Sequence, residues 1–164
     1  MSQNPEVRFV RALEQVLKGL TITYTDQGSR EAPEPFVAVT IGGVGDAVGY
    51  PVASIIPLGP QFRTERLGPQ TLSRKTREVG VGIELHYEHA DKEMGILNMS
   101  DILWTVVEAI LAQPRLGGAE SIEIGVVDYA YSFADELEGE ENQIPDWGYK
   151  GVAIIPVYAQ FKYS

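Results

Sequence analysis

Two histidines and a glutamate lie close together in the segment His86-Tyr87-Glu88-His89, and such groups can bind a metal ion or act as a general base. In an extended chain, His86 and Glu88 share one face while His89 points to the other, so the three side chains do not converge. The chain has no further histidine and no cysteine to complete a zinc site or a thiol nucleophile. We therefore predict surface histidines near a strand end, no metal, no cofactor and no catalytic residue.

A glycine-rich segment, GGVGDAVGYP at residues 42–51, follows an apolar run that is typical of a strand. Its third glycine comes one residue too late for the dinucleotide-binding fingerprint, and no Lys-Ser or Lys-Thr pair follows as in a P-loop. The sequence also lacks a helix start after these glycines, so it offers no helix N-terminus for a phosphate. We expect a flexible hairpin loop here, with a returning strand at residues 52–56.

Acidic residues are concentrated near the C-terminus, where Asp135, Glu136, Glu138, Glu140, Glu141 and Asp146 fall within twelve residues. Their spacing does not follow the calcium-binding loop of alternating Asp residues with a closing Glu. The pattern is more typical of a solvated, self-repelling turn, so we predict an acidic hairpin tip at residues 135–148.

Basic residues are concentrated in the middle of the chain, in a segment without periodicity at residues 58–75. It contains Arg63, Arg66, Arg74 and Lys75, and Arg77 follows directly. Loops of this length inside a compact domain are uncommon, and they tend to be either functional or mobile. We predict a long basic loop, which is either solvated and partly disordered or orders against another protein subunit.

The net charge of −10 argues against a protein that mainly binds phosphates. It divides unevenly, because residues 1–82 carry nine basic and eight acidic residues, whereas residues 83–164 carry four basic and fifteen acidic ones. The acidic half either supplies solvated loops, meets a basic surface of another copy, or lines a channel for an anionic polymer. The length predicts a single domain over residues 1–164, and we expect neither a signal peptide nor a membrane span.

The elements expected to organise this domain are one strand and two helices. Apolar and polar residues alternate through residues 76–89, as in a strand with one buried face. Asn4-Pro5-Glu6 predicts the start of a first helix that ends at Gly19. A second helix is expected over residues 101–113, beginning near Asn98 or Ser100, with Trp104 packed in the core rather than on a partner surface.

Further strands are expected at residues 21–25, 36–41, 121–133 and 149–163. The buried face switches within residues 125–127, which indicates a bulge. Pro156 in the last strand indicates either an edge strand or another bulge. The predicted fold is an α+β domain, with a single mixed, mainly antiparallel sheet and two main helices on one face.

Three stretches of this pattern resemble the tail terminator, or tail-completion, proteins of long-tailed bacteriophages. They are the opening helix at residues 7–20, the segment REVGVGIELHY at residues 77–87 with the helix 101–113 behind it, and the closing segment GVAIIPVY at residues 151–158. The resemblance spans essentially the whole chain and rests on patterns rather than on invariant motifs. That family has no catalytic residues to carry over.

The resemblance implies a structural virion protein, assembled in the host cytoplasm, that forms a ring, usually of six subunits, on the head-proximal end of the tail tube. Its partners would be other copies of itself, the tail tube protein and the head-side connector, and DNA would only pass through the channel. Subunit contacts are expected between Arg63, Arg66, Arg74, Lys75 and Arg77 and a neighbour's Glu136, Glu138, Glu140 and Glu141. Alternatives are another neck protein, a head–tail adaptor, a tail tube or baseplate subunit, or, more remotely, a small metal-dependent enzyme.

Overall fold

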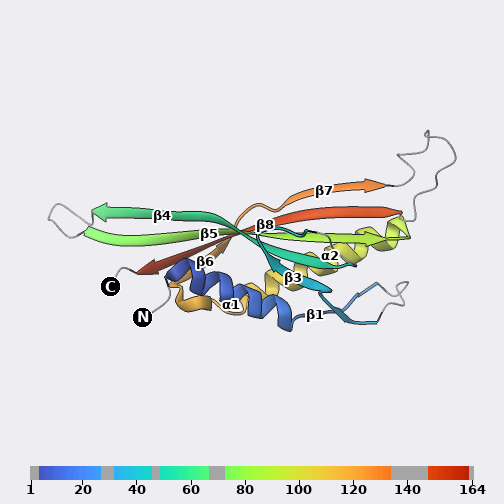
Figure 1. Ribbon diagram of the computed structural model, residues 1–164, viewed down its shortest axis with the longest axis horizontal. Coiled ribbons are helices and arrows are strands. Elements are labelled where there is room, and N and C mark those ends of the chain that lie inside the picture. The colour runs from blue at the N-terminus through green and yellow to red at the C-terminus, as the bar shows by residue number, and fades with distance from the viewer. Residues whose placement is uncertain (1–3, 27–31, 46–48, 67–72, 134–147, 163–164) are drawn as a thin grey trace.

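The computed structural model describes residues 4–26, 32–45, 49–66, 73–133 and 148–162, and for residues 61–76 it describes the backbone only. The molecule is elongated, with two helices beneath a long twisted sheet (Figure 1). Six strands form the main sheet, in the order β3-β4-β5-β8-β6 with β7 also paired to β8, and β1 (Thr21–Ile22) and β2 (Glu34–Pro35) form a separate pair. The α+β prediction is confirmed, with this second small sheet as an addition.

Strands β5 (Ser73–His89) and β8 (Tyr149–Lys162) form the centre of the sheet. They pair antiparallel without interruption, from Thr76 opposite Lys162 to His89 opposite Tyr149. The odd-numbered residues from Val79 to Tyr87 and from Tyr149 to Phe161 are buried under the helices, and Ile83 and Ile155 are fully so. The alternation read from the sequence therefore identifies the strand that both helices pack against.

Helix α1 (Pro5–Gly19) begins where the sequence indicates, because the Asn4 side chain accepts a hydrogen bond from the Val7 amide at 2.9 Å. Its buried face includes Phe9 and Leu13, both 0% exposed, and it packs on β3, β4 and β5. Glu14 pairs with Arg11 at 3.0 Å and with Lys18 at 3.6 Å. These two cations outweigh the effect of burial and hold the pKa of Glu14 below its ordinary value.

Helix α2 (Lys92–Leu111) begins about two turns earlier than predicted, because its cap is Asp91 instead of Asn98 or Ser100. Asn98, expected to cap the helix, is instead fully buried inside it and donates a hydrogen bond to the Tyr87 hydroxyl at 3.1 Å. Gly95 brings the helix against β8, because a Cβ atom there would lie 2.4 Å from the Tyr149 Cβ. Gly and Asn look like turn residues in the sequence, but here both serve contacts between the helix and the sheet.

The glycine-rich segment is not a hairpin loop. Strand β3 (Ala38–Ile41) runs parallel to β4 (Val52–Arg66), so the chain crosses back before β4 begins. Gly42, Gly43 and Gly45 have positive φ angles, which glycine adopts without steric cost, and they make this short return possible. The Gly43 amide donates to the Ser54 hydroxyl at 2.9 Å and fixes the return on the sheet.

The predicted basic loop at residues 58–75 is mostly strand. Strand β4 continues to Arg66, β5 begins at Ser73, and the two pair up to Arg66 opposite Ser73. A bulge between Pro57 and Gly59 interrupts the register, and Gly59 has a positive φ of 96°. The loop prediction is wrong. The residues of this ribbon do not alternate between apolar and polar types, so its strands leave no periodic signal in the sequence.

The predicted bulge in the strand at residues 121–133 is confirmed. Strand β6 (Ser121–Ile124) pairs with β8 up to Val157, and β7 (Asp128–Phe133) resumes opposite Ile154. Pro156 lies opposite this break, where its missing N–H is not needed, and its carbonyl accepts from the Gly125 amide at 2.8 Å. Of the two readings of Pro156, the bulge holds and the edge does not, because β8 has neighbours on both sides.

Replacing Gly95 by alanine should destabilise the protein by about 1–3 kcal/mol, because the new methyl group overlaps the buried Tyr149 side chain. Gly19→Ala is the matched control, since no atom lies within 4 Å of a Cβ at that helix end. Urea unfolding of both variants measures the difference. Equal stabilities of the two variants would contradict the close packing of α2 on β8.

Candidate functional site

The two histidines at the end of β5 lie on opposite faces of the sheet. His86 contacts Glu84 at 2.5 Å on the face of the sheet away from the helices. His89 lies on the other face beside the Tyr87 ring, and its Nδ1 accepts from the Asp91 amide at 2.9 Å. Among the described residues, no group of three His, Asp or Glu side chains could hold a metal ion. The predicted separation of the two histidines is confirmed.

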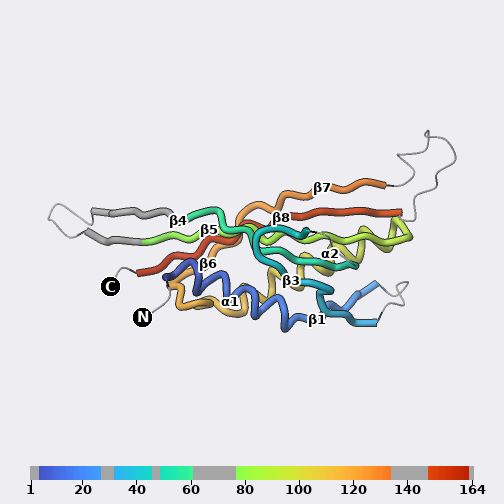
Figure 2. Tube along the Cα trace, in the orientation of Figure 1, coloured from blue at the N-terminus to red at the C-terminus, as the bar shows by residue number. Residues whose placement is uncertain are grey.

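The distal part of the β4–β5 ladder forms an arm, which we define as residues 61–66 and 73–76. Among the described residues, β3 pairs with β4 only from Val52 to Ile55 and β8 pairs with β5 only as far as Thr76, so the arm is two-stranded beyond the Arg63–Thr76 pair. The arm projects past the N-terminal end of α1 (Figure 1), and both described chain ends lie near its base (Figure 2). A two-stranded ribbon is marginally stable on its own in water, so a partner surface would stabilise the arm.

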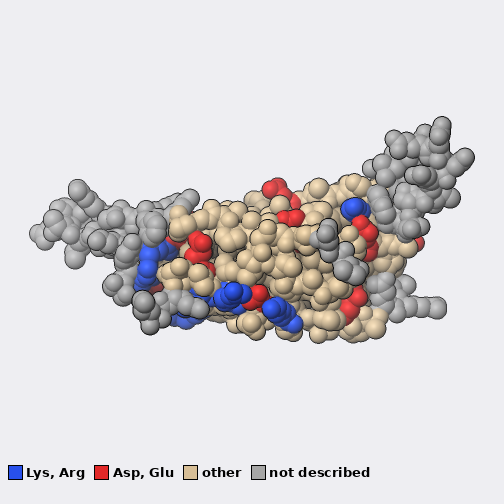
Figure 3. All heavy atoms as spheres, viewed as in Figure 1, with Lys and Arg blue, Asp and Glu red and all other residues tan. Residues whose placement is uncertain are grey.

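The arm collects most of the basic residues that the sequence singled out. Arg63, Arg66, Arg74 and Lys75 fall within four consecutive rungs of the ladder, which run from Arg63 opposite Thr76 to Arg66 opposite Ser73. Their side chains lie outside the described part of the chain. Figure 3 shows further basic side chains along the lower edge, from this end to the middle of the molecule, with acidic side chains among them. Helix α1 carries Arg8, Arg11 and Lys18 together with Glu6 and Glu14, so the basic character of this end rests on the sequence of the arm.

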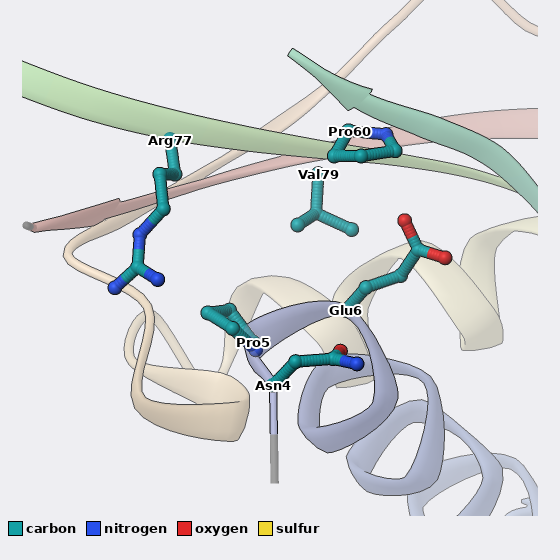
Figure 4. Close-up of a pocket in the computed structure, with 6 residues that line it drawn as sticks. All are labelled: Asn4, Pro5, Glu6, Pro60, Arg77 and Val79. Carbon is teal, nitrogen blue, oxygen red and sulfur yellow. The ribbon is translucent and has the colours of Figure 1, made fainter. Parts of the chain in front are cut away.

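Arg77, also predicted as a contact residue, lies at the base of the arm. One of its terminal nitrogens donates to the carbonyl of Lys162 at 3.0 Å, so the side chain ties β5 to the end of β8. It lines a pocket of about 330 Å³ together with Asn4, Pro5, Glu6, Pro60 and Val79. Figure 4 shows its guanidinium and the Glu6 carboxylate on different sides of this opening, so the two do not converge on one point.

The acidic side of the predicted contact lies outside the described residues. Glu136, Glu138, Glu140 and Glu141 belong to the segment 134–147, which follows β7 and precedes β8. These two strands pair with each other, with Phe133 opposite Tyr149. The chain therefore enters and leaves the acidic segment at neighbouring points, toward the end of the molecule opposite the arm (Figure 1).

Helix α2 exposes apolar side chains that the sequence analysis assigned to the core or did not single out. Trp104 is 65% exposed, Leu111 is 53% exposed and Ile96 is 41% exposed. The prediction that Trp104 packs in the core is wrong, because the buried face is formed by Ile102, Val106 and Ile110 instead. The helix is long and apolar enough by composition to span a membrane, a test that core helices of soluble proteins also pass.

Strand β7 carries a row of aromatic side chains at the side of the sheet. The ring centroids of Tyr129 and Tyr131 lie 5.4 Å apart, and those of Tyr131 and Phe133 lie 4.9 Å apart. The hydroxyls of Tyr129 and Tyr149 are hydrogen-bonded, and burial raises the pKa of Tyr129 to about 12. Tyr131 is still 53% exposed, because α2 packs mainly on β5 and β8, although Lys92 at its start lies 4.4 Å from the centroid of the Phe133 ring.

Comparisons with known proteins identify no family. No family model matches the sequence, and no curated protein matches it. The resemblance to tail terminators therefore rests on the residue patterns of this chain, and the function that it implies is a proposal.

Replacing Trp104 by alanine should change the free energy of unfolding by no more than about 0.5 kcal/mol, because an exposed side chain contributes little to folding. Ile102→Ala on the buried face of the same helix should cost about 2–5 kcal/mol. Urea unfolding of the two variants makes the comparison. A loss at Trp104 as large as that at Ile102 would contradict the described orientation of α2.

Proposed function

We propose that this protein assembles head-to-tail with copies of itself into a closed ring that caps the head-proximal end of a phage tail tube. The observation that carries the proposal is the division of charge along an elongated molecule. The basic arm lies at one end, and the strand that leads into the acidic segment points toward the other.

Two different surfaces at opposite ends of a subunit form a heterologous contact. Repeated contacts of this kind give a closed ring when the rotation from one subunit to the next brings the last subunit back to the first. Otherwise they give an open filament. The arm residues Arg63, Arg66, Arg74 and Lys75 and a neighbour's Glu136, Glu138, Glu140 and Glu141 supply opposite charges for this contact. Arg77 would act at the base of the arm, where it holds β5 to β8. A ring of six subunits is the form that the resemblance implies.

The proposed action is steric. The ring would stop the addition of tail tube subunits on one face and present its other face to the head-side connector. A net charge of −10 per subunit disfavours binding of DNA, which suits a channel that DNA must pass through. The proposal includes no enzymatic step, and among the described residues no group of His, Asp and Glu side chains could hold a metal ion.

The direct assay is growth of purified tail tube protein in the presence of this protein. The proposal expects tubes that stop growing and carry a ring at one end in negative-stain images. Unchanged tube growth would contradict the capping function. Incorporation along the whole tube would indicate a tube subunit instead.

Reversing two arm charges, in the double variant Arg74→Glu and Lys75→Glu, should weaken assembly, because attraction to the acidic segment becomes repulsion. The defect should grow as the salt concentration falls, since salt screens exposed charges over about 10 Å at 0.1 M. Light scattering at several salt concentrations measures both effects.

The matched control is the double variant Lys18→Glu and Arg115→Glu, which changes the net charge equally. Lys18 lies in the last turn of α1, and Arg115 is exposed before a short 3-10 helix, so neither belongs to the arm. If the arm variant assembles as well as the control at every salt concentration, the arm does not take part in the contact.

A further inference from the structure

Among the described residues, the longest open strand edges belong to β7 and to the distal part of β4, while the four-residue strands β3 and β6 have one unpaired edge each. β7 pairs with β8 alone, so the other edge of residues 128–133 is unpaired. β4 is covered by β3 only from Val52 to Ile55, so its outer edge is open from residue 56 to Arg66. Open edges present unused backbone N–H and C=O groups to any extended chain that fits them.

The near part of the β4 edge is unsuitable for pairing. Pro57 and Pro60 lack a backbone N–H, and the register shifts between Pro57 and Gly59. Natural sheets use prolines and bulges in this way to prevent pairing at an edge. The part of β4 left for pairing is therefore its end, residues 61–66, which belongs to the arm.

The β7 edge has none of these protective features. Its sequence, DYAYSF, contains no proline, glycine, lysine or arginine, and it pairs with β8 in regular register from Asp128 to Phe133. The contacts from Tyr129 to Tyr131 and from Tyr131 to Phe133 stiffen the strand on its helix side. An edge of six residues that is straight, aromatic and unprotected is suited to receive another strand.

The charges identify the occupant. Residues 116–149, which include β7, contain no lysine or arginine, and they carry the acidic residues Glu120, Glu123, Asp128, Asp135, Glu136, Glu138, Glu140, Glu141 and Asp146. Residues 61–77 carry Arg63, Arg66, Arg74, Lys75 and Arg77 against the single acid Glu65. Two lysines lie beside β7, because Lys150 is opposite Ser132 and the Lys92 ammonium lies 4.4 Å from the Phe133 ring centroid. By net charge in the sequence, the arm is the segment of opposite sign to residues 116–149.

Within one subunit the two edges cannot meet. The arm projects at one end of the long axis, whereas β7 runs toward the other end (Figure 1). A contact between them therefore requires a second copy.

We propose that the arm of one subunit adds to the β7 edge of the next, so that residues 61–66 pair with residues 128–133 and the sheet continues from copy to copy. This inference rests on the proposed head-to-tail assembly and adds the backbone contact that carries it. Main-chain hydrogen bonds would supply the affinity, and the opposite charges would select the arm over other strands. The pairing also gives the arm a third strand, which an isolated two-stranded ribbon needs for stability.

The absence of native cysteine allows a direct test by cross-linking. Paired strands bring opposing Cα atoms to about 4.5–5.5 Å, within the range that a disulfide bridges. Thr64→Cys is combined with Ala130→Cys in one variant and with Tyr131→Cys in another, because the two β7 positions point to opposite faces. Thr64, Ala130 and Tyr131 lie near the middle of their segments, so the paired cysteines come close together whether the two strands run parallel or antiparallel.

The expected result is a ladder of disulfide-linked multimers on a non-reducing gel after mild oxidation of at least one of these variants. The matched control combines Thr64→Cys with Ser121→Cys, an exposed position on β6, and it should give no ladder. Single-cysteine variants can give dimers at most. Absence of a ladder from both β7 variants, or an equal ladder from the β6 control, overturns the inference.

Failure of the arm-to-β7 contact can be distinguished from failure of the proposed function. A protein that still caps tail tubes while neither β7 variant cross-links retains its function, and only the arm-to-β7 contact falls. A protein that cross-links through β7 but leaves tube growth unchanged retains the contact and loses the capping function.

Discussion

The long antiparallel ladder between β5 and β8 is the contact on which the rest of the structure depends. Both helices pack on its odd-numbered side chains, and β7 and β6 attach to its β8 side. On the opposite face, Gly80 and Gly82 leave space that the side chains of Tyr158 and Ile154 fill. The ladder also fixes the base of the arm, because Arg77 donates to the carbonyl of Lys162 at its end.

Elements with one buried face could be predicted from the sequence. Strand β5 and helix α1 have clear periods of 2 and 3.6 residues, because each packs one side on the core. The start of α2 cannot be predicted from the sequence, because Gly95 and Asn98 resemble turn residues although both make contacts between helix and sheet. The arm has no such period in its sequence, so residue patterns predict a loop where the chain forms two paired strands.

The candidate contact surfaces show the same division. Charged residues are visible in the sequence, so the basic and acidic segments can be identified without knowledge of the fold. Open edges and exposed apolar side chains depend on topology, and the β7 edge and Trp104 could not be assigned from residue patterns.

Head-to-tail closure of this elongated subunit is the central claim, and sedimentation of the wild-type protein at low salt over a range of concentrations tests it most directly. The account predicts one discrete large species, of about 108 kDa for six subunits of 18.0 kDa, that dissociates as the salt concentration rises. A particle that remains at 18.0 kDa at every concentration, or a mass that grows without limit as open filaments would, contradicts it.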